Sequence, residues 1–299
     1  MISKEDEDSL FEELSDEELD PEEIAERLMA PRTTYDQSTI CMGLWGLNDS
    51  LKSGVAIDCR SKKQIENHEL VFVIDLDDAN RTLWKNHWDS SSDIRIMNPT
   101  VWQESSEGGR REIDYDRTLK VIHSIISKID GMLKKEVKIA GVVFDGLDKL
   151  LDNAENTMRL DKQLEIDEGV TFAFWRRRNK YFLDIMKATK SLSCARYFVT
   201  HSKMRQKKKT NQAGVEVVVR EWEEPDWHKS VADELWQIIH CKKVEDGEGD
   251  TTYSAKVEKS KGCPELVGSI HTTMTVKNKK VKFTGLPFLR DKENVEVRK

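Results

Sequence analysis

The sequence has no apolar run long enough to cross a bilayer. A membrane-spanning helix needs about 18 or more consecutive apolar residues, whereas charged residues make up 34% of this chain and interrupt its apolar segments early. The acidic N-terminus also lacks the basic and apolar stretches of a signal peptide. We therefore expect a cytoplasmic protein without a membrane partner.

Paired cysteines are absent as well. The five cysteines stand at positions 41, 59, 194, 241 and 263, and no two of them form a CxxC pair. Structural zinc sites and disulfide frameworks both need closely spaced or paired cysteines. This spacing argues against both and fits a reducing compartment.

The net charge of −7 is distributed unevenly. The first 30 residues hold 13 of the 55 acidic residues and 2 of the 48 basic ones, so the remaining 269 residues hold 42 acidic against 46 basic residues. Acidic runs of this kind are typical of solvated tails or of tails that contact a partner. We expect 1–32 to be an acidic, largely disordered arm, 33–290 one folded domain and 291–299 a tail. The arm would contact either a protein partner or the chain's own basic segments.

Short apolar runs alternate with helical patterns through the folded part, which predicts an α/β fold. Continuous apolar runs are typical of strands buried on both faces, so we expect a mostly parallel central sheet covered by helices, with antiparallel strands at the C-terminus. Two segments, 89–112 and 203–226, are predicted as long loops. The expected early strands are 38–45, 70–74, 138–144 and 195–200, the expected helices are 53–60, 116–134 and 172–189, and the expected late strands are 215–219, 235–241, 253–257, 270–276 and 281–284.

Residues 46–53 (GLNDSLKS) match the phosphate-binding pattern GxxxxGK[ST], except that Leu51 replaces the second glycine. In that pattern the loop N–H groups wrap the phosphates, the lysine neutralises them and the hydroxyl binds Mg²⁺. Leu51 would lie where the helix begins, and a side chain there is tolerated if it points away from the nucleotide. The alternative is an ordinary connection between a strand and a helix. The expected nucleotide-binding residues are Gly46, Asn48, Asp49, Ser50, Leu51, Lys52, Ser53 and Gly54.

Polar residues also follow three other predicted strands: Asp77, Asp145, and the pair Thr200 and His201. Taken singly, each is more typical of a helix cap or a structural contact. The carboxyl ends of parallel strands meet at one edge of a sheet, where ligands bind. Together with the loop at 46–53, these residues therefore indicate a single site.

This set resembles that of the RecA-like P-loop ATPases, most closely the phage and archaeal-virus nucleotide-binding proteins related to single-strand-annealing recombinases. The resemblance covers about residues 36–285 and implies ATP and Mg²⁺ as cofactors and, for a viral chain, the host cytoplasm. The implied roles are phosphate binding for Lys52, Mg²⁺ binding for Ser53 and Asp145, orientation of the attacking water for Asp77, and sensing of the γ-phosphate for Thr200 and His201.

The resemblance extends to a late pair of segments, 232–236 and 255–264. In ring-forming RecA relatives a basic pair in this hairpin reaches the γ-phosphate of the neighbouring subunit. Lys259 and Lys261 lie two apart on a predicted strand, hence on one face. They are the implied catalytic pair of a homo-oligomeric ring or filament; the alternative is a solvated strand face.

Two basic clusters flank the predicted sensor strand. Five bases fall within 203–209, and a second cluster at 175–181 has aromatic neighbours. Such clusters suit the backbone and the stacked bases of single-stranded DNA, although each could also be a solvated basic face. We expect Trp84, Trp88, Trp222 and Trp227 to pack inside. The expected nucleic-acid-binding residues are Arg176, Arg177, Arg178, Lys203, Arg205, Lys207, Lys208 and Lys209.

The sequence thus predicts a DNA-dependent ATPase that acts on single-stranded DNA in recombination, repair or replication. Leu51, and the short Asp77 where the family usually has Glu, keep open a non-hydrolysing scaffold that binds nucleotide or DNA. A motor for packaging or helicase loading is a third possibility.

Overall fold

The computed structural model describes residues 40–78, 80, 92–104, 109, 111–164, 168–210, 216–246, 249–278 and 280–286. The chain divides into two units at residue 36, and the first unit lies wholly outside the described residues. The expected acidic arm at 1–32, the expected tail at 291–299, and Trp84 and Trp88 lie outside them too. The expectations for these segments therefore stay predictions.

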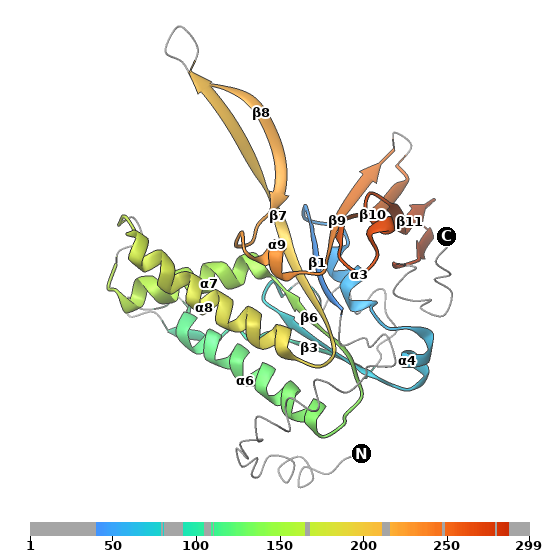
Figure 1. Ribbon diagram of the computed structural model, residues 1–299, viewed down its shortest axis with the longest axis horizontal. Helices are drawn as coiled ribbons and strands as arrows, with labels where there is room; N and C mark the ends of the chain where they lie inside the picture. The colour runs from blue at the N-terminus through green and yellow to red at the C-terminus, as the bar shows by residue number, and fades with distance from the viewer. Residues whose placement is uncertain are drawn as a thin grey trace. The chain divides into compact units, whose positions relative to one another are not determined.

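A ten-stranded sheet forms the centre of the fold, and six of its strands run parallel (Figure 1). Their order across the sheet is β9-β1-β7-β6-β2-β3. The parallel strands are β1 (Cys41–Gly46), β2 (Leu70–Asp75), β3 (Ile94–Met97), β6 (Ile139–Asp145), β7 (Ala195–Thr210) and β9 (Gln237–Glu245). Most residues of β1, β2 and β6 are buried, as expected for strands covered on both faces.

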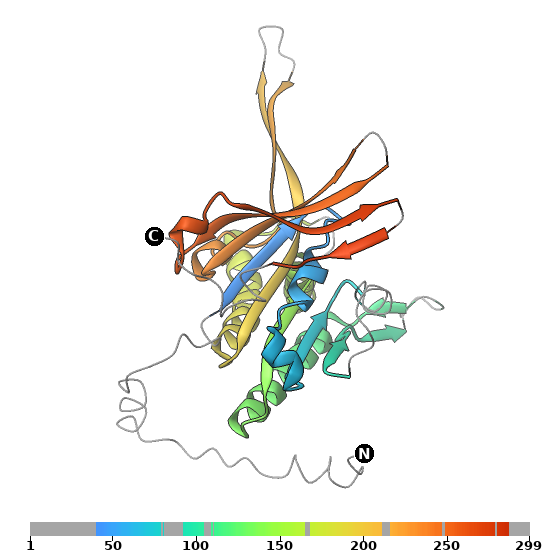
Figure 2. The ribbon, with the colours of Figure 1, turned by 90° about the vertical axis from the view of Figure 1, so that its right-hand side faces the viewer.

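Three antiparallel strands continue the sheet beyond β9, in the order β9-β10-β11-β12 (Figure 2). They are β10 (Thr251–Ser260), β11 (Ile270–Lys277) and β12 (Lys280–Phe283), with a short 3₁₀ turn, η2, at Pro264–Leu266. The structure therefore confirms the predicted α/β fold with its mostly parallel sheet and its antiparallel C-terminal strands.

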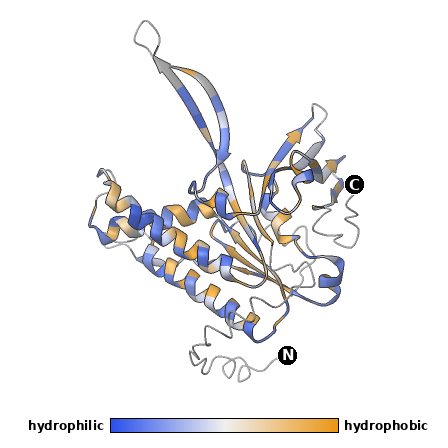
Figure 3. Cartoon of the chain, in the orientation of Figure 1, coloured by the Kyte–Doolittle hydropathy of each residue, from blue (hydrophilic) through white to orange (hydrophobic). Residues whose placement is uncertain are grey.

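Helices cover both faces of the parallel part. On one face lie α6 (Tyr115–Lys134), α7 (Leu147–Asp161) and α8 (Phe172–Ser191), which share an apolar core with the sheet. On the other face α3 (Lys52–Ile57) shares a second apolar core. Two further short helices are α4 (Lys62–Glu66) and α9 (Val231–Glu234). In Figure 3 the apolar residues gather where helices and strands meet, as the helical spacing of Leu119, Ile122, Ile126 and Ile129 predicts.

Two predicted loops contain strands, although the strand expected at 215–219 overlaps one of them, and one helix was not predicted. Residues 203–226 are not a loop: β7 continues to Thr210 and pairs with β8 (Glu216–Pro225) as a two-stranded ribbon that extends past the sheet (Figures 1 and 2). We call residues 202–225 the arm; it is a different segment from the acidic arm expected at 1–32. The segment 89–112 contains β3 and a small hairpin of β4 (Trp102–Glu104) and β5 (Arg111–Ile113). Helix α7 was missed because its apolar face is interrupted by polar residues.

No helix in the described part of the chain is both long and apolar enough to cross a membrane.

Candidate functional site

The loop after β1 lies at the point of the sheet where the strand order reverses. β1 is flanked by β7 and β9. From β1 the chain crosses beyond β7 and β6 to β2, whereas after β7 and β8 it returns on the other side of β1 as β9. Connections that leave in opposite directions open a crevice at the carboxyl ends of the strands, and ligands of open α/β sheets bind there.

Leu51 adopts the backbone conformation that the phosphate-loop pattern reserves for glycine. Its φ is 64° and its ψ is 14°, in the left-handed region, directly before α3 begins. Glycine adopts this region without strain and leucine rarely does. The Leu51 side chain is 8% exposed and packs in the core between the sheet and α3. The side chain therefore turns into the core between the sheet and α3.

Gly46 is required at the other end of the loop because there is no room for a side chain. A Cβ at this position would lie 2.2 Å from the carbonyl oxygen of Cys241 on β9. The close approach of β9 thus fixes where the loop leaves the sheet. Asn48 and Asp49 are exposed in the loop, and Ser50 is buried behind it.

Lys52 is the first residue of α3 and only 5% of it is exposed. Its Nζ donates a hydrogen bond to the carbonyl oxygen of Leu47 at 3.2 Å, so the side chain folds back across the loop. Burial lowers the pKa of Lys52, and the carboxylates of Asp145 and Asp77 partly oppose this shift. A buried ammonium of this kind is stabilised by any anion that enters the crevice.

Two buried carboxylates lie side by side at the ends of β2 and β6. Asp75 and Asp145 are partners in the register of these strands and are 0% and 1% exposed. Asn80 joins them: its backbone N–H donates to Asp75 Oδ2 at 3.0 Å, and its side-chain amide donates to Asp145 Oδ2 at 2.6 Å. Burial, and then the neighbouring Asp145, raise the pKa of Asp75 to about 6. Two like charges so close favour a bound cation.

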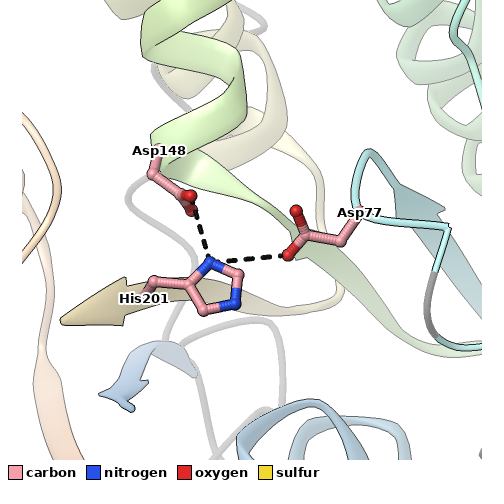
Figure 4. Close-up of side chains that lie close together, drawn as sticks. All are labelled: Asp77, Asp148 and His201. Carbon is pink, nitrogen blue, oxygen red and sulfur yellow. Dashed lines mark hydrogen bonds and ion pairs between the residues drawn. The ribbon is translucent and has the colours of Figure 1, made fainter. Parts of the chain in front are cut away.

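A second charged cluster consists of Asp77, Asp148 and His201 (Figure 4). Nδ1 of His201 lies 3.0 Å from Asp148 Oδ2, in the first turn of α7, and 3.6 Å from Asp77 Oδ2, just after β2. The hydrogen bond with Asp148 raises the pKa of His201. Burial acts to raise the pKa of Asp148, but the hydrogen bond and the charge of His201, together with smaller contributions from a backbone hydrogen bond and Lys149, lower it by more, so the net shift is downward. Burial, and then Asp148, raise the pKa of Asp77.

The acidic groups suggest two places for a cation, and they are not equivalent. The ligand atoms of Asp77, Asp148 and His201 lie within 4.8 Å of one another, but Nδ1 of His201 would have to lose its hydrogen bond to Asp148 in order to bind a metal. Among the described residues, Oδ1 of Asp145 is buried without a hydrogen-bond partner. This free carboxylate oxygen and the half-buried hydroxyl residue Ser53 on α3 are the donor types that Mg²⁺ prefers.

Thr200 connects the second cluster to the arm. Its Oγ1 donates to the carbonyl oxygen of Asp226 at 2.7 Å and lies 3.3 Å from Asp148 Oδ1. The backbone N–H of Asp226 in turn donates to the carbonyl oxygen of His201 at 2.8 Å. Both predicted sensor residues are therefore hydrogen-bonded to Asp226, the first residue after β8.

Two basic side chains at the base of the arm, Lys203 and Arg205, form ion pairs with acidic residues. Lys203 Nζ lies 2.8 Å from Asp226 Oδ1, and Arg205 Nε lies 2.6 Å from Glu224 Oε1. Because cross-strand partners share a face, Lys203, Arg205 and the 38% exposed Trp222 lie on one face of the ribbon. Met204 and its partner Glu223 lie on the other. Lys207 is exposed, and the side chains of Lys208 and Lys209 lie outside the described part of the chain.

The expectation that the four tryptophans pack inside holds for Trp227, which is 6% exposed in the core, and is wrong for Trp222. Trp222 lies on the two-stranded ribbon, which extends past the sheet (Figures 1 and 2).

Two of the three arginines in the second basic cluster form ion pairs between α8 and α7. Arg177 Nη2 lies 2.8 Å from Asp161, and Arg178 Nη1 lies 3.5 Å from Glu155, both on α7. Arg176 is exposed and stacks over the ring of Phe172 at 5.0 Å. Of these three arginines, Arg176 is the one that takes part in neither of these two ion pairs.

Lys259 and Lys261 both bind the end of α9. Lys259 Nζ donates to the carbonyl oxygen of Ala232, and Lys261 Nζ donates to that of Asp233 at 3.0 Å. Lys261 lies one residue past the end of β10, and a bulge falls between Val257 and Lys259. Their common direction comes from the carbonyls of α9, which attract cations, and not from strand alternation as predicted.

Sequence reasoning missed three residues of the site: Asp75, Asn80 and Asp148. Asp75 ends the apolar run of β2, and Asp148 follows Asp145, the last residue of β6, by three residues. Both positions lie at or just after the end of a predicted strand, which could have marked them as site residues. Nothing in the sequence marked Asn80, because only the fold brings it between Asp75 and Asp145.

No protein-family model matches this sequence, and no curated protein matches it. Among solved structures, the chain is similar to the KaiC-like protein PH0186 from the hyperthermophilic archaeon Pyrococcus horikoshii OT3. The sequence identity is 10%, the TM-score is 0.44, and the match covers 82% of this chain and 89% of that one. Similarity at this level supports no inference about function, which has to come from the site itself.

Proposed function

We propose that the protein binds ATP with Mg²⁺ in the crevice and hydrolyses it as a RecA-like ATPase. The observation that carries the proposal is the left-handed backbone of Leu51 directly before the buried Lys52, at the switch point of the sheet. An ordinary strand–turn–helix connection requires neither feature. Together they would give a loop at the start of a helix, with a cation placed to meet a phosphate.

Mg²⁺ would be held by Ser53 and by Asp145, whose Oδ1 has no partner among the described residues. When bound, the ion neutralises charge that builds up on the phosphate oxygens. Asp75 and Asn80 would act behind it: the Asn80 amide orients Asp145, and the adjacent Asp75 adds negative charge to the site.

The remaining residues have separate parts in hydrolysis. Lys52 exchanges its bond to Leu47 for one to the phosphates. Asp77, whose raised pKa makes it a stronger base than an ordinary aspartate, orients the attacking water. Thr200 and His201 report the γ-phosphate to the arm. In an oligomer, Lys259 or Lys261 would leave α9 and reach the site of the neighbouring subunit.

Single-stranded DNA is the partner that best fits the arm. The face with Lys203, Arg205 and Trp222 combines cations with an exposed aromatic ring, which suits phosphates and stacked bases. The opposite face, with Met204, Gln206 and Glu223, offers no cation among its described side chains. We infer that DNA lies along the first face and replaces the ion pairs of Lys203 and Arg205.

Nucleotide binding and hydrolysis by the Lys52→Ala variant test the proposal. We expect this variant to hydrolyse ATP at least about 100-fold more slowly than wild type, since the loss of one charged donor to a transition state has an effect of this size. Lys63→Ala, on the exposed side of α4, is the matched control and should keep wild-type activity. Equal hydrolysis by wild type and Lys52→Ala would contradict the proposal.

The alternative is a non-hydrolysing scaffold that binds nucleotide or DNA. The contact of Asp77 with His201 favours it, because an aspartate held in an ion pair is less free to orient water. ATP binding that is lost in Lys52→Ala, with no hydrolysis in the presence or absence of single-stranded DNA, would support the scaffold.

A further inference from the structure

His201 uses only one of its two ring nitrogens for the acidic cluster. Nδ1 faces both Asp148 and Asp77, while Nε2 points away from both carboxylates (Figure 4). The other oxygen of Asp148, Oδ1, lies 3.3 Å from the hydroxyl of Thr200, whose single proton also faces the carbonyl oxygen of Asp226 at 2.7 Å. The ring orientation is thus fixed from the buried side, with Nε2 left for a ligand.

The charge state of the ring decides what Nε2 offers. If Nδ1 carries the proton that binds Asp148, a neutral ring has a bare Nε2, which accepts hydrogen bonds and repels a phosphate oxygen. A charged ring has protons on both nitrogens and donates from Nε2. The charged groups that face the ring are Asp148 on α7, Asp77 after β2 and Lys52 on α3. Lys52 disfavours the charged ring, and the two carboxylates favour it.

We propose that Asp148 is a positioning residue that fixes the His201 ring and keeps its second proton, so that Nε2–H is donated to the terminal phosphate of bound ATP. The inference rests on the proposed nucleotide site and adds a residue to it. Asp148 touches neither nucleotide nor water in this role and acts only through His201.

The consequence is that discrimination between ATP and ADP depends on pH through Asp148. Asp148→Asn keeps an oxygen that accepts from Nδ1–H but removes the negative charge that holds the second proton. We expect the ratio of ADP to ATP dissociation constants in this variant to match wild type near pH 6 and to fall about tenfold to hundredfold below it near pH 8, the effect of losing a hydrogen bond to a charged group.

The test is a calorimetric titration of full-length protein with ADP and with a non-hydrolysable ATP analogue, each with Mg²⁺, from pH 6 to pH 8. Asp152→Asn, on the exposed side one turn further along α7, is the matched control and should follow wild type. His201→Gln should show a low ratio at every pH, and Asp148→Asn should add no further loss to it. A profile of Asp148→Asn that coincides with wild type would overturn the inference.

Failure of the proposed function looks different, since neither nucleotide would then bind wild type, or Lys52→Ala would bind both unchanged.

A second measurement uses wild type alone, so it tests the inference even if the variants do not fold. In a ¹⁵N-histidine NMR titration we expect His201 to carry its proton on Nδ1 and to lose its second proton at a higher pH than His228 and His271, whose pKa values burial lowers. A His201 that loses its second proton at a lower pH than those two would also overturn the inference.

Discussion

The charged groups at the carboxyl end of the sheet are buried, whereas those of the arm are exposed, although one strand, β7, contributes to both regions. At Thr200 and His201 this strand lies among the buried groups Asp145, Asp148 and Lys52. A few residues later it carries Arg205, which is 53% exposed and pairs with Glu224.

The difference shows which charges depend on the surrounding fold and which remain exposed to solvent. In the crevice, loss of solvent makes each charge depend on its neighbours, so the pKa values of Lys52, Asp75, Asp77 and His201 all shift. On the arm, water screens the pairs, which contribute about 0–1 kcal/mol each. The ion pairs of the arm can therefore break at little loss of stability.

The largest effect is expected at Leu51, where the site and the core meet. Leu51→Ala should destabilise the protein by about 3–5 kcal/mol, because it empties a core position, while the left-handed strain at this position stays the same. Leu51→Gly should be about 1 kcal/mol more stable than Leu51→Ala, since glycine removes the strain. Urea unfolding of both variants measures the difference.

Val55 is the matched control, because it lies in the same core with ordinary helical geometry. There the order should reverse, with Val55→Gly about 1 kcal/mol less stable than Val55→Ala. The same order at both positions would mean that the backbone of Leu51 is not strained.

An intermediate effect is expected at Asp75. Its pKa of about 6 lies above the ordinary value of 3.8, so wild type loses stability as the pH rises from about 4 through 6. Asp75→Asn should therefore be about 2–3 kcal/mol more stable than wild type at pH 8 and equal to it below about pH 4. Unfolding curves across this range test the sign.

The exposed Asp116, paired with Lys120, gives the contrast. Asp116→Asn should change stability by less than about 0.5 kcal/mol at any pH. A stability gain of Asp75→Asn that does not grow with pH would show that Asp75 is not strained by its neighbours.

A small effect on stability is expected on the arm, where binding should change instead. Glu224→Gln frees Arg205 and should tighten single-stranded DNA binding a few-fold at low salt, whereas Arg205→Ala should weaken it and lower the salt dependence by about one phosphate. Both should shift unfolding by less than about 1 kcal/mol. Anisotropy of a labelled oligonucleotide across a salt series measures binding, and opposite or absent changes would argue against this face.

The sequence predicted the parallel sheet because β1, β2 and β6 are short, continuous apolar runs whose burial hardly depends on their neighbours. It also placed Lys52, Asp145 and His201 at strand ends, since parallel strands carry their ends to one edge. It failed for the arm, because the alternation of charges at 203–209 is equally typical of an exposed loop and of an exposed strand. Only pairing with β8 distinguishes the two.

The sequence alone thus determined the class of fold, the phosphate-loop pattern and the edge of the sheet at which the polar residues lie. Tertiary structure decided how those residues pair: Asn80 between two carboxylates, Asp148 on His201, and Leu51 in a conformation usual for glycine. The reason is physical. Periodicity and strand ends follow from local chain geometry, whereas hydrogen bonds between residues far apart in sequence exist only once the core has brought their strands together.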